Sequence, residues 1–412
     1  MAPARSSLHG LDGLNFFIAN VQTGFGPFIS VYLTGSAWPQ TDIGLVLTVS
    51  SLVSLVGLLP GGMLIDALAA KRAAAAVAIV AIAGSALALA LSPRFPLVLL
   101  AEVLHGVASC LLGPAIAAIT IGLVAPHLIS RRFARNASFA SVGNGIAALL
   151  MGVCGRLLSA RAVFVLTAAL AVPALAALWR IRAVDIDPRH TSADSQSERR
   201  NVPPARLVDI LENRDLLIFG GCLALFHLGN AAMLPLAGSI ITMRSNEWAT
   251  SLIAACIVVP QIVVAVFSPW VGRKAEQWGR KPVLLLGFAA LPVRGVLFAL
   301  IASPWLLVVV QVLDGISAAV IGVLLPIVIA DLTRRSGHFN AALGAAGTAA
   351  GLGASISPSL AGFTIDQFGG PAAFLLLAGL GAAGAALVWA RMPETRPAPA
   401  RQSSLQRQQP RS

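Results

Sequence analysis

Three titratable residues lie deep inside long apolar stretches of this chain, where a charge is costly: Glu102, His105 and Asp314. A carboxylate in such surroundings must be paired, hydrated or protonated, because an isolated buried charge is strongly disfavoured. A group whose charge depends so closely on its surroundings suits a proton carrier. We therefore predict proton coupling, with Asp314 as the first candidate and Glu102 and His105 next. The alternative is a structural hydrogen bond between helices.

Uncharged polar residues occupy two further apolar stretches, beside glycines and prolines that interrupt a helix. These residues are Asn20, Gln22, Thr23, His227 and Asn230. A polar, interrupted segment at membrane depth faces a cavity and not lipid. We predict that these side chains contact a substrate, with packing between helices as the alternative.

A short charged pattern occurs twice, about 210 residues apart along the chain. The first copy has Gly62, then Asp66, then Lys71 and Arg72. The second has Gly272, then Glu276, then Arg280 and Lys281. In both copies the acid follows the glycine by four residues and apolar stretches flank the pattern. This is typical of a short basic connection between two membrane helices.

Composition limits the class of protein. Of the 412 residues 57% are hydrophobic and 11% are charged, and the mean hydropathy is +0.82. A soluble protein carries roughly 25% charged residues, so we predict an integral membrane protein. The net charge of +12 does not indicate a nucleic-acid partner, because the basic residues fall in short loops between apolar stretches.

No motif for catalysis or a bound cofactor is evident. The four cysteines lie inside apolar stretches without metal spacing, and there is no nucleotide-binding glycine loop, zinc signature or nucleophile elbow. We expect no enzyme activity, no cofactor and no metal.

The apolar stretches predict an all-α fold with twelve membrane spans. The spans are 12–34, 42–68, 72–92, 96–122, 136–156, 162–182, 215–242, 248–271, 281–302, 304–330, 340–366 and 370–392. The predicted parts are an N-terminal six-helix half (1–182), a cytoplasmic linker (183–214), a C-terminal six-helix half (215–392) and a disordered cytoplasmic tail (393–412).

Orientation follows from the cations. With both termini in the cytoplasm, all but five of the 29 Lys and Arg residues lie on the inside, which is the usual bias. The Ala- and Gly-rich composition and short loops favour a bacterial inner membrane.

With its repeated pattern and its six-plus-six layout, the chain resembles a transporter of the major facilitator superfamily over essentially its whole length. The resemblance implies two pseudo-symmetric six-helix bundles that work by alternating access without ATP. It also implies a latch that closes the cytoplasmic side, in which Asp66 and Glu276 pair with nearby cations. The latch residues are Gly62, Asp66, Lys71, Arg72, Arg131, Arg132, Gly272, Glu276, Arg280, Arg334 and Arg335. The alternative is a set of interfacial charges that only fix topology.

The resemblance further implies that Arg294, on the ninth span, is peripheral, so that no cation stands in the central cavity. We therefore disfavour strongly anionic substrates and predict proton-coupled export, by antiport, of a small hydrophobic or cationic compound. Proton-coupled uptake, by symport, of a small neutral metabolite is the alternative, and a non-transporting membrane receptor or scaffold is a third. The expected partners are a small-molecule substrate, protons and the lipid bilayer, without nucleic acid, and we expect a monomer.

Overall fold

The computed structural model describes residues 5–68, 70–125, 128–186, 212–244, 246–334 and 339–396, and every regular element in these ranges is a helix. The first half comprises α1 (Arg5–Thr23), α2 (Pro27–Gly35), α3 (Gln40–Ala67), α4 (Lys71–Leu91), α5 (Phe95–Leu123), α6 (Ile129–Leu157), α7 (Ala160–Trp179) and the short η2 (Ala183–Asp185). The second comprises α11 (Arg214–Asn230), α12 (Met233–Arg244), η3 (Asn246–Trp248), α13 (Ala249–Gln277), α14 (Arg280–Leu300), α15 (Pro304–Val310), α16 (Val312–Leu332), α17 (Phe339–Phe368) and α18 (Gly370–Arg391). Most of the expected linker and the tail from residue 397 lie outside the described residues.

The helices confirm the twelve-span fold. Within the described residues, eleven helical stretches are long and apolar enough to cross a membrane. The 30-residue α17 packs against α3 and α11 and completes the twelve.

Three of the spans are broken into two helices. The first span breaks between α1 and α2, where Gly26 takes a positive φ of 84° and Pro27 starts the new helix. Glycine tolerates this left-handed conformation and proline suits a first helical position, so the local sequence dictates the break. The seventh span breaks at 231–232 between α11 and α12, and the tenth at Gln311 between α15 and α16.

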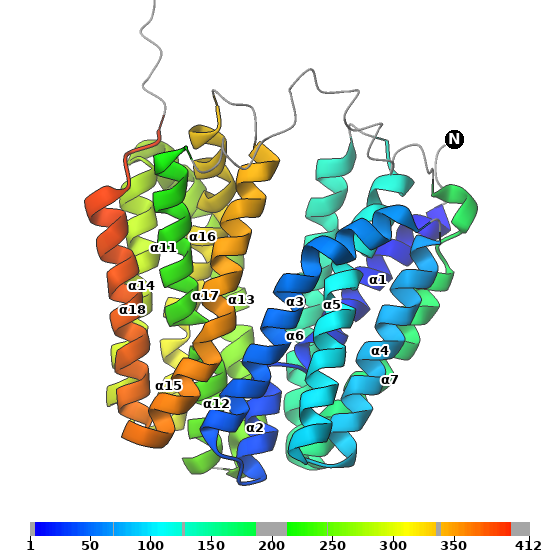
Figure 1. The fold of residues 1–412 in the computed structure, drawn as a ribbon, viewed down its shortest axis with the longest axis horizontal. Helices are drawn as coiled ribbons and strands as arrows, with labels where there is room; N and C mark the ends of the chain where they lie inside the picture. The colour runs from blue at the N-terminus through cyan, green and yellow to red at the C-terminus, as the bar shows by residue number, and fades with distance from the viewer. Residues whose placement is uncertain are drawn as a thin grey trace, which may run out of the picture.

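The two halves meet at one end of the molecule. Figure 1 shows them apart at the end that carries the N-terminus, and close together at the other end, where α2 lies beside α12. We call the first end the basic end, because the connections from α3 to α4, α5 to α6 and α13 to α14 lie there and are followed by Lys71, Arg72, Arg132, Arg135, Arg280 and Lys281. The opposite end comprises the turns at 36–39, 92–94, 158–159, 301–303 and 369.

The hydrogen bonds found between the described parts of the two halves cluster at the opposite end. Asp366, on α17, accepts from the backbone N–H of Gln40 (3.1 Å) and of Thr41 (2.6 Å) at the start of α3. The Thr34 hydroxyl donates to the Ser239 hydroxyl at 3.0 Å between α2 and α12. Backbones approach closely here as well, since a Cβ added at Gly44 would clash with the Pro358 carbonyl oxygen. The structure is therefore sealed at the opposite end.

Candidate functional site

A cavity of about 350 Å³ lies between the two halves. It is lined by Gly26, Pro27, Leu47 and Ser51 from the first half and by Asn230, Ala231, Leu234, Pro235, Arg294, Asp314, Ala354 and Pro358 from the second. The breaks in the first and seventh spans open onto it directly, and Asp314 lies in the first turn of α16, just after the break in the tenth. Broken helices at membrane depth are typical of substrate sites in transporters, because their free backbone groups face a cavity.

An ion pair forms part of the cavity wall. The Arg294 guanidinium on α14 donates to the Asp314 carboxylate and, at 2.6 Å, to the Asn230 side-chain oxygen. Its Nε contacts the Met233 sulfur at 3.3 Å. The Arg294 side chain is 2% exposed and that of Asp314 is 22% exposed. The arginine is thus the buried member of the pair, and the carboxylate is the member that a cavity ligand can reach.

The expectation that no cation stands in the cavity is wrong. Arg294 lines the cavity together with Asp314, although it belongs to the ninth span. The physical reason is that an arginine inside an apolar helix needs a counter-charge, and the carboxylate that supplies it lies on the neighbouring α16. The argument against anionic groups in the substrate assumed a cavity without a cation, so it no longer holds.

The other two proton-coupling candidates lie together in the first half, in a cluster of polar side chains. The His105 ring nitrogen Nε2 lies 2.8 Å from the Gln22 side-chain oxygen, and the ring stacks on Phe25 at a centroid distance of 3.8 Å. Glu102 is 1% exposed, and its Oε1 has no hydrogen-bond partner among the described residues. The Ser50 hydroxyl donates to the Glu102 backbone carbonyl at 3.0 Å. Phe25 and Ser50, which contact His105 and Glu102, each adjoin a cavity-lining residue in the chain.

The residues predicted to contact a substrate do not all meet in the cavity. Asn230 lines it, whereas Asn20 is buried and donates to its own helix at the Phe16 carbonyl (2.7 Å). Thr23 donates to the Asn144 side-chain oxygen at 2.9 Å between α1 and α6. His227 packs edge-on against Phe226. Asn20 and Thr23 thus make helix contacts in this conformation.

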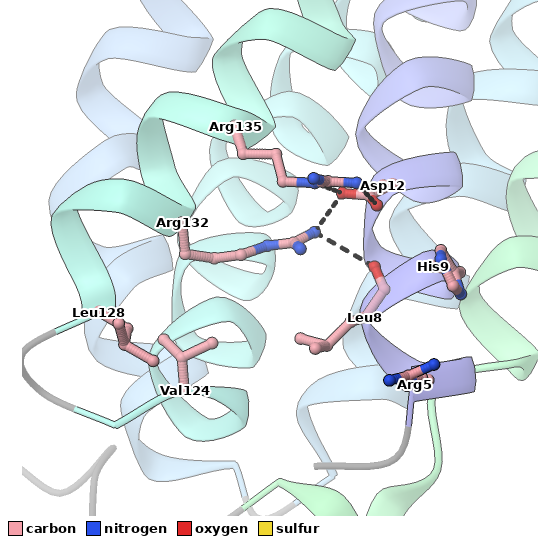
Figure 2. A pocket seen from close by; sticks show the side chains of 8 residues that line it. All are labelled: Arg5, Leu8, His9, Asp12, Val124, Leu128, Arg132 and Arg135. Atoms are coloured by element: carbon pink, nitrogen blue, oxygen red, sulfur yellow. Dashed lines mark hydrogen bonds and ion pairs between the residues drawn. The ribbon is translucent and has the colours of Figure 1, made fainter. Parts of the chain in front are cut away.

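At the basic end of the first half, a cluster of charges surrounds a second pocket of about 480 Å³ (Figure 2). Asp12 on α1 accepts from Arg132 at 2.7 Å and from Arg135 at 2.8 Å, both on α6. The sequence offers Arg132 as one of several cations that could pair with Asp66, and in the structure Arg132 pairs with Asp12. The side chains of Asp66 and Arg131 lie outside the described residues. The sequence did not reveal the role of Asp12, because Asp12 lies at the start of an apolar span, where acidic residues are common.

The remaining latch residues of the first half bond to their own bundle. Lys71 donates to the Ile65 carbonyl at 3.0 Å, which closes the turn after α3. Arg72 lies 3.4 Å from the Trp179 carbonyl of α7. A Cβ added at Gly62 would meet nothing within 4 Å. In this conformation Lys71 and Arg72 therefore bond within their own half.

The second half repeats this arrangement. Arg280 pairs with Asp331 on α16 at 3.2 Å, and Gly272 has open space beside it. Glu276 and Arg334 are exposed, and Arg335 lies outside the described residues. Glu394, just after α18, accepts from the backbone N–H of Arg280 at 2.7 Å and so caps α14. No ion pair joins the two halves among the described latch residues.

Comparison with known proteins identifies the family. The model of the Major Facilitator Superfamily matches residues 11–243 and 221–411. The uncharacterised MFS-type transporter Rv2456c of Mycobacterium tuberculosis is 39% identical over 389 residues, which is 93% of each chain. The class B tetracycline resistance protein of Escherichia coli is 33% identical over 102 residues, or 25% of each chain.

A solved structure shows the same fold. The nucleoside transporter NupG superposes with a TM-score of 0.74 at 15% sequence identity, over 94% of this chain and 99% of NupG. Two pseudo-symmetric six-helix halves, a cavity between them and a family model that matches nearly the whole chain lead to one conclusion: this protein is a membrane transporter that belongs to the major facilitator superfamily.

Proposed function

We propose that this transporter exports a small hydrophobic or amphiphilic compound in exchange for protons, with Asp314 as the proton carrier. The observation that carries the proposal is the placement of Asp314. Its carboxylate lies on the cavity between the halves, partly exposed, while its partner Arg294 is almost completely buried. A titratable group at this position can meet both a substrate and a proton.

Competition for one carboxylate gives antiport. Asp314 can pair with Arg294, bind a proton or accept a group of the substrate, but it cannot bind a proton and a cationic group together. Removing one partner from a buried ion pair costs about 3–5 kcal/mol, so each exchange at Asp314 must be compensated by the next ligand. Substrate and proton then occupy the site in turn, as exchange requires.

The sealed opposite end supports alternating access. We propose that the basic end and both termini face the cytoplasm of a bacterial plasma membrane, because Lys and Arg concentrate there. The conformation described here is then closed toward the outside. For the reverse state we propose that the latch residues, with Asp66, Arg72, Glu276 and Arg280 at their centre, join the halves across the basic end. The working unit is a monomer.

One relative supports the direction of transport. The class B tetracycline resistance protein is named for drug resistance, which is the phenotype that an exporter confers. The cavity agrees with an apolar cargo, because Pro27, Leu47, Leu234 and Pro235 form much of its wall.

Uptake of a small neutral metabolite with protons is the second candidate. The Arg294–Asp314 pair is neutral as a unit, and Asn230 and Ser51 offer hydrogen bonds beside it. A neutral polar molecule could bind these two side chains without separating the charges. In that case Glu102 and His105, in the polar cluster of the first half, become the stronger carriers of the proton.

Proton movement in inside-out membrane vesicles tests the proposal. We expect amphiphilic compounds to release protons from energised vesicles that contain the parent protein, and Asp314→Asn to abolish this release. Asp42→Asn, an acid near the start of α3 away from the cavity, is the matched control and should behave as the parent does. A release that survives Asp314→Asn and disappears in Glu102→Gln or His105→Gln would move the carrier role to the first half. No release across a broad panel would contradict export and favour uptake.

A further inference from the structure

We propose that the substrate is a zwitterion, whose anionic group binds Arg294 while its cationic group takes the place of Arg294 at Asp314. The inference rests on the proposed function, because it concerns the same cavity, and it narrows the substrate to one chemical class. It follows from the charge balance of the Arg294–Asp314 pair in four steps.

The first step is the burial of Arg294. A guanidinium has five N–H donors, and three of them serve Asp314, Asn230 and Met233. The group lines the cavity although its side chain is only 2% exposed. It therefore retains donors for a planar anionic group, such as a carboxylate, that enters from the cavity.

The second step excludes a simple cation. Arg294 and Asp314 are the charged residues that line the cavity. If a cationic substrate bound Asp314 alone, Arg294 would stay buried without a counter-charge, next to a second positive charge. A buried charge that loses its partner is strongly disfavoured, so the site as built rejects a lone cation.

The third step compares the other ligand classes. A lone anion on Arg294 leaves Asp314 without its partner, so it binds only together with a proton and cannot be exchanged for one. A neutral ligand leaves the pair intact and does not compete with the proton. A zwitterion inserted into the pair satisfies both residues, and a proton arriving at Asp314 then expels its cationic group. Among these classes, the zwitterion is the one that leaves neither residue unpaired while it is bound and that still competes with a proton for Asp314.

The fourth step concerns the rest of the ligand. The walls around the pair are apolar, with Pro27, Leu47, Leu234, Pro235 and Pro358, and the cavity measures about 350 Å³. The expected ligand therefore has both charges at one end and a compact apolar or aromatic body at the other.

A matched set of ligands tests the inference by equilibrium binding to the purified full-length transporter in lipid nanodiscs. The set takes aryl-substituted α-amino acids of increasing size, which carry both charges at one end. Each scaffold is used as the zwitterion, as its methyl ester (cation only) and as its N-acyl derivative (anion only). We expect at least one scaffold to bind as the zwitterion with at least about tenfold higher affinity than as either derivative, because a site that pairs two charges penalises the loss of one.

The double variant Arg294→Gln with Asp314→Asn removes both charges while keeping the site neutral. We expect it to fold and to bind the three forms of each scaffold with similar affinity. Asp42→Asn should keep the preference of the parent. Equal or tighter binding of the methyl esters by the parent would overturn the inference, as would failure of every scaffold to bind the folded parent.

The outcomes separate this inference from the proposed function. Zwitterion-selective binding without proton release in vesicles would retain the substrate class and contradict exchange. Proton release driven equally by methyl esters would retain exchange and overturn the substrate class.

Discussion

The pairing of a buried arginine with a partly exposed aspartate leaves the carboxylate as the member of the pair that faces the cavity. Arg294 is almost completely buried and bonds to residues of α11 and α16, whereas the Asp314 carboxylate can be reached from the cavity. Under the proposed function, a proton or a ligand therefore acts on Asp314, and Arg294 sets which group can bind there.

The pair predicts a pattern of stabilities. Asp314→Asn should lower the free energy of unfolding by about 3 kcal/mol, near the lower end of the cost of breaking a buried ion pair, because Asp314 is partly exposed. Arg294→Gln together with Asp314→Asn should recover a large part of this loss, since no charge is left alone. Thermal unfolding of purified protein in detergent measures both, and additive losses in the double variant would contradict the pairing.

Because of Glu394, we expect the folding stability at the basic end to depend on pH. Burial raises the pKa of this carboxyl, but the backbone N–H donors of Arg396, Arg280 and Lys281 outweigh burial and hold it below its usual value. A lowered pKa in the folded state stabilises the protein above the unfolded value of about 4.3, and this contribution is lost as the pH falls through the folded value.

We expect the melting temperature of the parent to fall more steeply than that of Glu394→Gln as the pH drops below the usual glutamate pKa of about 4.3. Melting curves between about pH 3 and about pH 6, a range that brackets this value, test the expectation. Parallel pH profiles for the two proteins would show that the cap on α14 contributes nothing.

The sequence predicted Asp314 as a buried functional acid from its isolation in an apolar stretch, but it did not predict its partner. Arg294 was assigned to the periphery by resemblance alone, although two unmatched charges in consecutive spans are a signal for pairing. Asp12 and Asp366 escaped notice for another reason. Acids at the ends of spans are common, and only the three-dimensional packing shows that these two accept bonds from distant helices.

At the scale of helices, local residues explain some of the breaks and not others. Gly26 and Pro27 dictate the break between α1 and α2 through backbone conformation, so it could be predicted. The break at Gln311 has no adjacent glycine or proline. Gln311 is fully buried and donates to the Cys256 carbonyl of α13 at 3.2 Å, a long-range contact that no local pattern reveals.

The start of α3 provides a test of the sealed end. Asp366 on α17 accepts from two backbone N–H groups in the first turn of α3, where a carboxylate is favoured by otherwise unpaired donors and by the helix dipole. We expect Asp366→Ala to weaken the contact between the halves and to expose buried residues behind it.

The measurement is the rate at which a membrane-impermeant maleimide labels Ser239→Cys, in a background without the four native cysteines. Ser239 is 1% exposed, and we expect Asp366→Ala to raise its labelling rate severalfold. Asp42→Ala, in the same first turn of α3, is the control. Unchanged labelling in Asp366→Ala would mean that this carboxylate does not hold the end closed.

At the scale of the whole molecule, the repeated charged pattern predicted two similar halves, and the fold confirms them. The repeated pattern could not predict which end is closed in this structure, because closure rests on contacts between the two halves. The contacts at the closed end are those of α3 with α17 and of α2 with α12, and they leave no periodic trace in a sequence rich in alanine and glycine.

A reversible cross-link between the halves tests whether this end must open during transport. Thr34 and Ser239 bring their hydroxyl oxygens to 3.0 Å across the halves, so cysteines at both positions are close enough for a disulfide. In the cysteine-free background, oxidation should abolish transport and a reductant should restore it. Thr34→Cys alone is the control, and transport that persists in the oxidised double variant would contradict alternating access at this end.

The polar lining of the cavity is distributed unequally between the halves. Asn230, Arg294 and Asp314 all belong to the second half, whereas the first contributes Ser51 and otherwise Gly26, Pro27 and Leu47. A molecule held by the charged pair would stay bound to the second half throughout the transport cycle, while the largely apolar surface of the first half moves relative to it. The substrate would then hardly move relative to its binding site. It would cross the membrane because the closed contact between the halves shifts from one side of the substrate to the other.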